Sequence, residues 1–459
     1  MGFGPLGYDF LFSPTRRKTI NEQINPTNSV PALTIKTSIR GIDRWIETHK
    51  DDLVDLTCRL VNVDTTVPPG RNYDKIAHIL ASELKQLGST PTISYIPQST
   101  FKEKANIDVG LEGPRPNVYA TIKGKDKGPR IVLNGHMDVV PAQQDGWKTN
   151  PFKATVKSGK IYGRGAADMK GSDACMLYAI KALVETETPF NGSIMSTYTT
   201  DEEVGGYTGV NYLADKQIIT KDIDYGLSTD TGIEAIDIAS LGDIEFVITV
   251  HGVSAHSGRG WTGVNAIEHA SALIERFKTV GVEIGRKRSR IRTEPVYGSR
   301  WMRPGVYVTM IKGGIKGNII PDTCELLVDR RFIPEENAET VRREIAEVVR
   351  GYSRETGVRI TNKPLPGYNP MMTPPDHPLV RVVRKAARRV LGANVPVGGS
   401  QGSTDMATLS ALGIPVAILG ATRAESNIHG INEHVRIDDL VSITKIMAQS
   451  YLELLSARQ

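Results

Sequence analysis

The stretch "GSIMSTYTTDEEVGG", residues 192–206, decides the fold, because it joins a strand pattern directly to a cluster of acids. The residues up to Thr199 are typical of a short, apolar strand, and three consecutive acids and a glycine pair follow. Adjacent like charges repel, so a folded chain keeps them together only if water or a strongly positive group compensates them. The stretch therefore predicts a strand that ends either in a solvated acidic turn or at a positively charged site.

On both sides of this stretch, short strand patterns alternate with helix patterns. Helical periodicity covers residues 41–61 and 73–87, and residues 130–140 form a strand-like run before a glycine-rich loop. Alternation of this kind indicates an α/β fold in which helices cover both faces of a sheet.

The pattern changes near residue 240. Residues 241–365 read as strand, helix, two strands, helix and strand, the order of a ferredoxin-like α+β domain, and the α/β pattern then returns. We therefore predict an N-terminal extension (1–40), a larger domain formed by 41–240 and 366–459, and an inserted domain (241–365).

Composition narrows the class of protein. The chain has 459 residues and a net charge of +5, with acids and bases interleaved, so neither a basic nucleic-acid surface nor binding to nucleic acid is predicted. No apolar stretch approaches the ~20 residues that a membrane span needs, so no membrane partner is predicted. Three dispersed cysteines predict no disulfide framework and favour a cytoplasmic location. The mild positive charge favours a small anionic substrate.

Acids and histidines gather where the strand-like runs end. They are His136 and Asp138, Asp168 in a glycine-rich loop, Glu202 and Glu203, and Asp230. In an open α/β sheet, ligand sites form outside the carboxyl ends of the strands, so these side chains can converge.

Carboxylates together with imidazole are the ligands that a divalent cation of the zinc type requires. One acid pair alone is more typical of a solvated turn. Four clusters at the ends of strand-like runs favour a metal site, in which Glu203 binds an ion while Glu202 faces a water molecule.

The motifs "GHMDVVP", "GRGAADMKG", "TTDEEVGG", "STD" and "IHGINEHV", in this order, resemble the metallopeptidase family that contains acetylornithine deacetylase, succinyl-diaminopimelate desuccinylase, carboxypeptidase G and the aminoacylases. The resemblance covers about residues 41–459. It implies a zinc-exopeptidase-like catalytic domain with an inserted ferredoxin-like domain that serves as a lid and in dimerisation.

The resemblance also implies roles for the clustered residues. Two divalent ions, zinc or alternatively cobalt or manganese, would be bridged by Asp168; His136 and Asp230 would bind one ion, and Glu203 and His429 the other. Glu202 would be the general base. Asp138 would hold the His136 imidazole by its other ring nitrogen. Thr231 and Gly232 follow Asp230, where a proline often stands in the family.

In the inserted domain the resemblance points to three more residues. His256 in "HGVSAHSGRG" would stabilise the developing oxyanion, often in the site of a partner subunit. Asn318 and Arg330 would line the substrate end of the site, where an arginine can hold a carboxylate. A homodimer formed through the inserted domain is implied in the same way.

The stretch "GGSQG", residues 398–402, also fits the G-x-S-x-G pattern of serine hydrolases, with Asp405 and His429 downstream. Asp405 lies too close to Ser400 in sequence to orient His429 well, and a serine mechanism leaves His136 without a purpose. The stretch better matches the substrate loop of the family, with Gly399, Ser400 and Thr404 as candidate contacts.

We predict a metal-dependent hydrolase that cleaves the amide bond of a small N-acyl amino acid or dipeptide-like compound. The alternatives are hydrolytic deamination of an unusual, for example aromatic, amine at the same metal site, a hydrolase that depends on Ser400, and a non-catalytic binding protein. The sequence retains all the predicted ligands and the base, which favours an enzyme.

Overall fold

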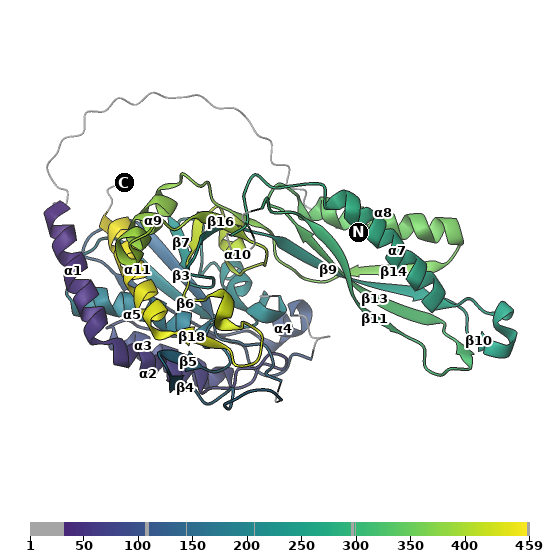
Figure 1. Cartoon of the computed structure of the whole chain (residues 1–459), viewed down its shortest axis with the longest axis horizontal. Coiled ribbons are helices and arrows are strands. Elements are labelled where there is room, and N and C mark those ends of the chain that lie inside the picture. The colour runs from purple at the N-terminus through teal and green to yellow at the C-terminus, as the bar shows by residue number, and fades with distance from the viewer. Residues whose placement is uncertain are drawn as a thin grey trace, which may run out of the picture.

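The computed structural model describes residues 32–456 apart from 106–109, 144, 206, 295–297 and 299. Two modules lie next to each other (Figure 1): a large module built from the two ends of the chain, and a narrower inserted module built from its middle. This arrangement confirms the α/β fold class with an inserted α+β module.

The large module is organised around one mixed sheet, the large sheet. Its path is β1-β2-β6-β3-β7-β17-β8-β15, and β16 also pairs with β8. The bounds are β1 Thr92–Tyr95, β2 Pro116–Lys123, β3 Arg130–His136, β6 Ser193–Thr199, β7 Tyr225–Ser228, β8 Ile236–Ser240, β15 Met371–Met372, β16 Val397–Ser400 and β17 Val416–Ile418. At its centre, β3 runs parallel to both β6 and β7, so their carboxyl ends lie at the same edge.

Helices cover both faces of the large sheet, and the central strand β3 shows why. Ile131 and Leu133 belong to the core on one face, whereas Val132 belongs to the core on the other. Both sets are apolar because successive side chains of a strand point to opposite faces. The helices of this module are α1 Ala32–Thr48, α2 Lys50–Val61, α3 Tyr73–Gln86, α4 Gln98–Lys104, α5 Lys170–Glu185, α6 Tyr212–Asp215, α9 Pro378–Leu391, α10 Met406–Ala411 and α11 Ile437–Ser456.

Helix α5 is buried on almost every side, because it packs between β3 and the helices α1, α2 and α11. Its buried residues, among them Ala174, Met176, Leu177 and Ile180, lie all round the helix, as expected for a helix without a solvent face. Short helical turns complete the module: η2 Glu202–Val204, η3 Tyr207–Asn211 and η6 Ala424–Ser426. A small sheet adds β4 Thr155–Lys157, β5 Lys160–Tyr162 and β18 His434–Arg436.

The inserted module has the predicted element order. Its sheet, the inserted sheet, has the order β11-β13-β9-β14 and is antiparallel throughout. The elements are β9 Gly242–His251, α7 Ala266–Ile284, β11 Gly305–Gly313, β13 Thr323–Phe332, α8 Ala338–Thr356 and β14 Arg359–Pro364, with β10 Ala255–His256, η4 Ser257–Thr262 and β12 Ile319–Ile320 at one end. Burial alternates strictly along β9, because α7 and α8 cover only one face of the sheet.

Local signals set the ends of the two helices of this module. The Asn265 side chain accepts a hydrogen bond from the Ile267 amide at the start of α7, and Asn337 caps α8 in the same way. Helix α8 ends at Gly357, whose φ of 70° is in the left-handed region that favours glycine.

Helix α1 begins within the stretch predicted as an N-terminal extension (1–40). Ile39 is buried against the core of the large module, so at least the end of that stretch belongs to the fold. Residues 1–31 lie outside the described residues. Among the helices described, none is both long and apolar enough to cross a bilayer.

Candidate metal centre and active-site cavity

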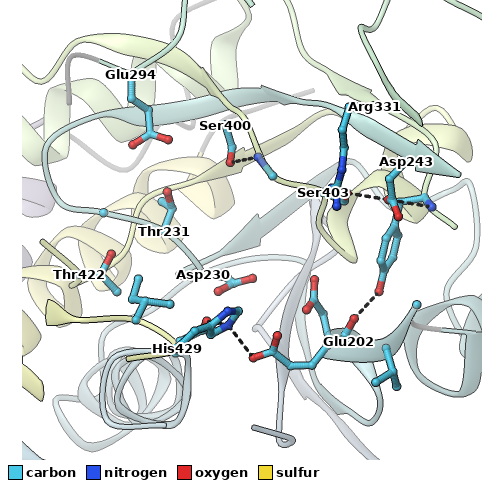
Figure 2. A pocket seen from close by; sticks show the side chains of 18 of the residues that line it. Glu202, Asp230, Thr231, Asp243, Glu294, Arg331, Ser400, Ser403, Thr422 and His429 are labelled. Carbon is cyan, nitrogen blue, oxygen red and sulfur yellow. Dashed lines mark hydrogen bonds and ion pairs between the residues drawn. The ribbon is translucent and has the colours of Figure 1, made fainter. Parts of the chain in front are cut away.

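The predicted metal ligands come from the edge of the large sheet where the parallel strands end. His136 is the last residue of β3, Glu203 lies in η2 directly after β6, and Asp230 follows β7. Asp168 precedes α5, and His429 comes from the loop before β18. Figure 2 shows Glu202, Asp230 and His429 along one side of a cavity, with Ser400 and Glu294 on the other. The cavity has a volume of about 850 Å³.

The five side chains form two groups that share Asp168. The His136 Nε2 atom lies 3.1 Å from Asp168 Oδ1 and 3.9 Å from Asp230 Oδ1. The His429 Nε2 atom lies 3.1 Å from Asp168 Oδ2 and 3.2 Å from Glu203 Oε1. In each group the possible ligand atoms all lie within 4.8 Å of one another. Asp168 therefore turns one oxygen towards each group, as a bridging ligand does.

Burial and mutual repulsion make this cluster electrostatically unfavourable without a cation. Burial, and then the charge of Asp168, raises the pKa of Asp230 to about 7. Hydrogen bonds with Asp168 and Glu203 raise the pKa of His429 to about 10. The acids thus hold the imidazole protonated, and a divalent cation offers the same compensation with a larger charge. Imidazole and carboxylate donors in this arrangement suit an ion of the zinc type.

The two adjacent glutamates have different surroundings, which answers the question raised by residues 192–206. Glu203 lies against His429, whereas the Glu202 side chain lines the cavity without joining either ligand group. Burial raises the pKa of Glu202 well above its usual range. Glu202 therefore has the position expected of a general base.

Asp138 acts differently from the prediction. Its carboxylate is 3.8 Å from His136 Nδ1, beyond hydrogen-bond distance, and the Asp138 backbone oxygen lies closer to that nitrogen, at 3.1 Å. The carboxylate instead accepts hydrogen bonds from the amides of Glu202 (3.3 Å) and Glu203 (3.0 Å). Asp138 thus fixes the turn that carries the base and a ligand, while its main chain orients His136.

Glu433 is a positioning residue that sequence reasoning missed. It is fully buried, and one carboxylate oxygen accepts hydrogen bonds from the amides of Gly165, Ala167 and Asp168. The Arg164 guanidinium pairs with the other oxygen. Glu433 therefore holds the loop of the bridging ligand. Its position in the stretch "HGINE", four residues after His429, was the available signal.

Tyr368 and Asp405 form a second supporting contact that the sequence did not predict. The Tyr368 hydroxyl lies 3.1 Å from the Glu202 backbone oxygen and 3.0 Å from Asp405 Oδ1. Thr199 and Asn134 donate to the other Asp405 oxygen, at 3.1 and 3.3 Å. Asp405 therefore ties the end of β6 to Tyr368 rather than orienting a histidine.

Gly399, Ser400 and Thr404 were predicted as substrate contacts. Of these three residues, only Ser400 lines the cavity. Gly399 is needed for packing, because a Cβ atom there would lie 2.2 Å from Met302 Sδ. The Thr404 hydroxyl accepts a hydrogen bond from the Met406 amide at the start of α10. The substrate contacts predicted for Gly399 and Thr404 are therefore wrong for this cavity, and Gly402 and Ser403 line it instead.

The side chains that a serine mechanism would use, Ser400 and His429, form other contacts. Among the described residues, the Ser400 hydroxyl accepts a hydrogen bond from the Gly402 amide (3.1 Å), and His429 contacts Asp168 and Glu203. No serine–histidine–aspartate relay is assembled in this part of the chain.

Arg330 is not in the cavity. It is fully buried on the face of β13 that packs against α8, and it pairs with Glu336 (2.8 Å) and Glu344 (2.9 Å). Successive strand residues point to opposite faces, so the neighbouring Arg331 lines the cavity and donates to the Ser403 hydroxyl (2.9 Å). The prediction that Arg330 lines the substrate end of the site is therefore wrong, and Arg331 lines the cavity instead.

His256 and Asn318 lie together, but outside the cavity of their own chain. His256 is exposed in β10, which pairs with β12 directly after Asn318. The Asn318 backbone oxygen accepts a hydrogen bond from the Ser257 amide (3.0 Å). Figure 1 shows β10 at the end of the inserted module that is farthest from the large module. Within one chain, neither residue reaches the metal ligands.

Fold and site together define a metal-dependent hydrolase with a zinc-exopeptidase-like large module. The model of the Peptidase family M20/M25/M40 matches residues 132–453, and the chain belongs to this family. It is therefore an enzyme that hydrolyses amide bonds of small molecules. The assignment confirms the predicted family, metal dependence and reaction class.

Relatives of known name agree with this assignment. The chain is 28% identical to N-formyl-4-amino-5-aminomethyl-2-methylpyrimidine deformylase from Bacillus subtilis, over 89% of this chain and 96% of that protein. It is 26% identical to succinyl-diaminopimelate desuccinylase from a Psychrobacter species, with the same two shares covered. In fold it is similar to a di-peptidase from Saccharomyces cerevisiae (TM-score 0.74, 18% identity, 91% of this chain and 98% of that chain).

Proposed function

We propose that the protein hydrolyses the amide bond of a small N-acylated amine, such as an N-acyl amino acid or a dipeptide-like compound, with two divalent ions held by the two ligand groups. The observation that carries this proposal is the sharing of Asp168 between His136 and Asp230 on one side and Glu203 and His429 on the other. The bound ions would polarise the carbonyl and lower the pKa of a water molecule.

Glu202 performs the proton transfers. Its carboxylate accepts a proton from the attacking water and donates it to the leaving nitrogen. Burial raises the pKa of Glu202, which favours the protonated form that the second transfer needs. Asp138 and Tyr368 keep the turn that carries Glu202 in place through its amide and its backbone oxygen.

The names of the relatives support the substrate class. One removes a formyl group from an aminopyrimidine, and the other removes a succinyl group from an amino acid. Both reactions break an acyl–nitrogen bond, for which a polarised carbonyl, an activated water and a proton donor suffice. An anionic group on the substrate would face Arg331, which lines the cavity.

The position of His256 supports a homodimer formed through the inserted module. β11 is an edge strand of the inserted sheet, and its Tyr307, Met310 and Ile311 are exposed large hydrophobic side chains. A second copy placed along β11 would cover them. The exposed His256 and Asn318 could then reach the cavity of the partner and stabilise the oxyanion there.

The identity of the ions is proposed as zinc, with cobalt and manganese as alternatives that the same ligands accept. We also propose a cytoplasmic location, which the free cysteines Cys58, Cys175 and Cys324 support.

A turnover screen tests the proposal. The protein is freed of metal, reconstituted with zinc, cobalt or manganese, and assayed with N-formyl, N-acetyl and N-succinyl derivatives of amino acids and amines and with dipeptides. Hydrolysis of at least one acyl class, lost on chelation and restored by metal, is expected. Metal binding without hydrolysis of any acyl–nitrogen bond would contradict the proposal.

A further inference from the structure

Glu294 enters the cavity from the connection between α7 and β11, which leaves the inserted module and lies against β16 of the large sheet. The Gly399 amide donates a hydrogen bond to the Arg292 backbone oxygen (2.8 Å), and a parallel bridge joins Thr293 to Gly399. This contact places Glu294 on the cavity wall. Figure 2 shows its carboxylate pointing into the space above Thr231, across the cavity from His429.

The Glu294 side chain is buried without a partner. The residue is only 9% exposed, and within the described ranges nothing forms a hydrogen bond or an ion pair with its carboxylate. Burial, and then the charge of Glu234, raises the pKa of Glu294 to about 7. A carboxylate that faces the cavity without a protein partner, in a largely buried side chain, costs free energy, and a glutamine of the same shape would lower this cost.

The cationic side chains on the cavity wall are already paired with acids other than Glu294. In the described part of the chain these cations are Arg331, Arg423 and His429. Arg331 donates to Asp329 (3.0 Å), and His429 lies in the ligand group of Glu203.

Arg423 is held by Asp439, because its Nε and Nη2 atoms lie 2.6 and 2.9 Å from the two carboxylate oxygens. Its remaining nitrogen lies 3.5 Å from Glu234, so Glu234 has a partial partner. Two divalent ions would compensate the acids of the ligand groups. Glu294 is then a buried acid on the cavity wall whose charge the described residues leave uncompensated.

We propose that Glu294, with Glu234 beside it, binds a cationic group of the substrate, so that the substrate is an N-acylated compound with a second, basic nitrogen such as an amine, a guanidine or a protonated nitrogen heterocycle. This inference rests on the proposed function and names its substrate class. It differs from the predicted anionic substrate, because the group that Glu294 recognises is positive. A cation with N–H donors satisfies both the charge and the hydrogen-bonding capacity of the carboxylate.

Matched probes isolate the charge. The substrates are ω-(N-formylamino)alkylguanidines with two to five methylenes and the corresponding alkylureas, which have nearly the same shape but no charge. They are assayed on the metal-loaded wild type, on Glu294→Gln and on Glu425→Gln. Glu425 is exposed, near the cavity rim but outside its lining, so its variant removes the same charge without touching the site.

For at least one chain length, we expect the wild type and Glu425→Gln to prefer the guanidine over the urea. The kcat/KM for the guanidine should be about ten- to a hundredfold higher, because one charged hydrogen bond contributes that much. In Glu294→Gln the preference should fall to about one while turnover of the urea changes little. Equal rates for guanidines and ureas in the wild type, or an unchanged preference in Glu294→Gln, would overturn the inference.

A binding measurement separates this inference from the proposed function. Butylguanidinium and butylurea are titrated calorimetrically into the same metal-loaded proteins. Tighter binding of butylguanidinium, by about tenfold or more and lost in Glu294→Gln, would support the cation subsite even if no formyl compound were hydrolysed. Equal binding of the two probes to the wild type would overturn this inference even if formyl compounds were good substrates.

Discussion

In the large module, both faces of β3 are buried, whereas in the inserted module β9 and β13 bury every second residue. Burying a charge along a strand that is covered on both sides costs free energy, and the predicted metal ligands of the large module lie at strand ends instead. A strand with one open face can carry charged groups along its length, and Arg331 uses such a position on β13. The large module therefore holds the metal ligands, and the inserted module supplies cavity wall and an exposed edge.

The strongest test of the large module removes the residue that both ligand groups share. Asp168→Ala should lose metal at both positions and reduce turnover to background, because each group keeps only two ligands. Elemental analysis and kcat/KM measure the effect, with Glu425→Gln as the control. A variant that kept two ions per chain would disprove the bridging role.

The next test separates the base from the ligands. Glu202→Gln should keep its metal but lose about 10²–10⁴-fold in kcat, because the amide cannot accept the proton of the water. Glu203→Ala, one residue away, should instead lose metal. The assignment of the base is wrong if Glu202→Gln remains nearly as active as the wild type.

The contribution of the inserted module is tested at its edge strand. Ile311→Lys places a charge on exposed β11 and should convert the proposed dimer to a monomer. If His256 acts across the interface, kcat should fall by about 10²–10³-fold. His256→Ala should show the same kinetic loss with the dimer intact. Light scattering gives the mass, and Met372→Lys, an exposed position on the large module, is the control. A fully active monomer would refute the shared site.

The affinity for metal should rise with pH, because two of the predicted ligands must first lose a proton. The pKa of His429 is raised to about 10 and that of Asp230 to about 7, so both must lose protons to become ligands. Protons leave as the pH rises, and affinity should therefore increase between pH 6 and 8 by about tenfold per pH unit for each proton released. Competition with a chelator at several pH values measures it. Affinity that is independent of pH would mean that these groups do not bind the ion.

The smallest effect is expected at the serine of the alternative mechanism. Ser400→Ala removes one hydrogen bond with the Gly402 amide and should change kcat/KM by less than about tenfold. Abolished turnover with metal retained would revive the serine mechanism.

The sequence by itself determined the fold class, the inserted module and the candidate ligands at the strand ends, because short stretches of neighbouring residues carry each of these signals. A strand pattern and the acid that ends it are neighbours in the chain, so His136, Glu203 and Asp230 could be identified before their convergence was seen. The order of strands and helices in the inserted module was likewise local information.

Only the tertiary structure decided which groups form the rest of the cavity, since these come from segments that are distant in sequence and meet by lateral packing. A shift of one residue along β13 exchanges Arg330 for Arg331 because alternate side chains face opposite sides. Glu294 becomes part of the cavity because its segment packs on β16, and His256 lies far from the ligands of its own chain because β10 is at the far end of the inserted module. Periodicity shows which face of a strand is apolar, but not what the other face meets.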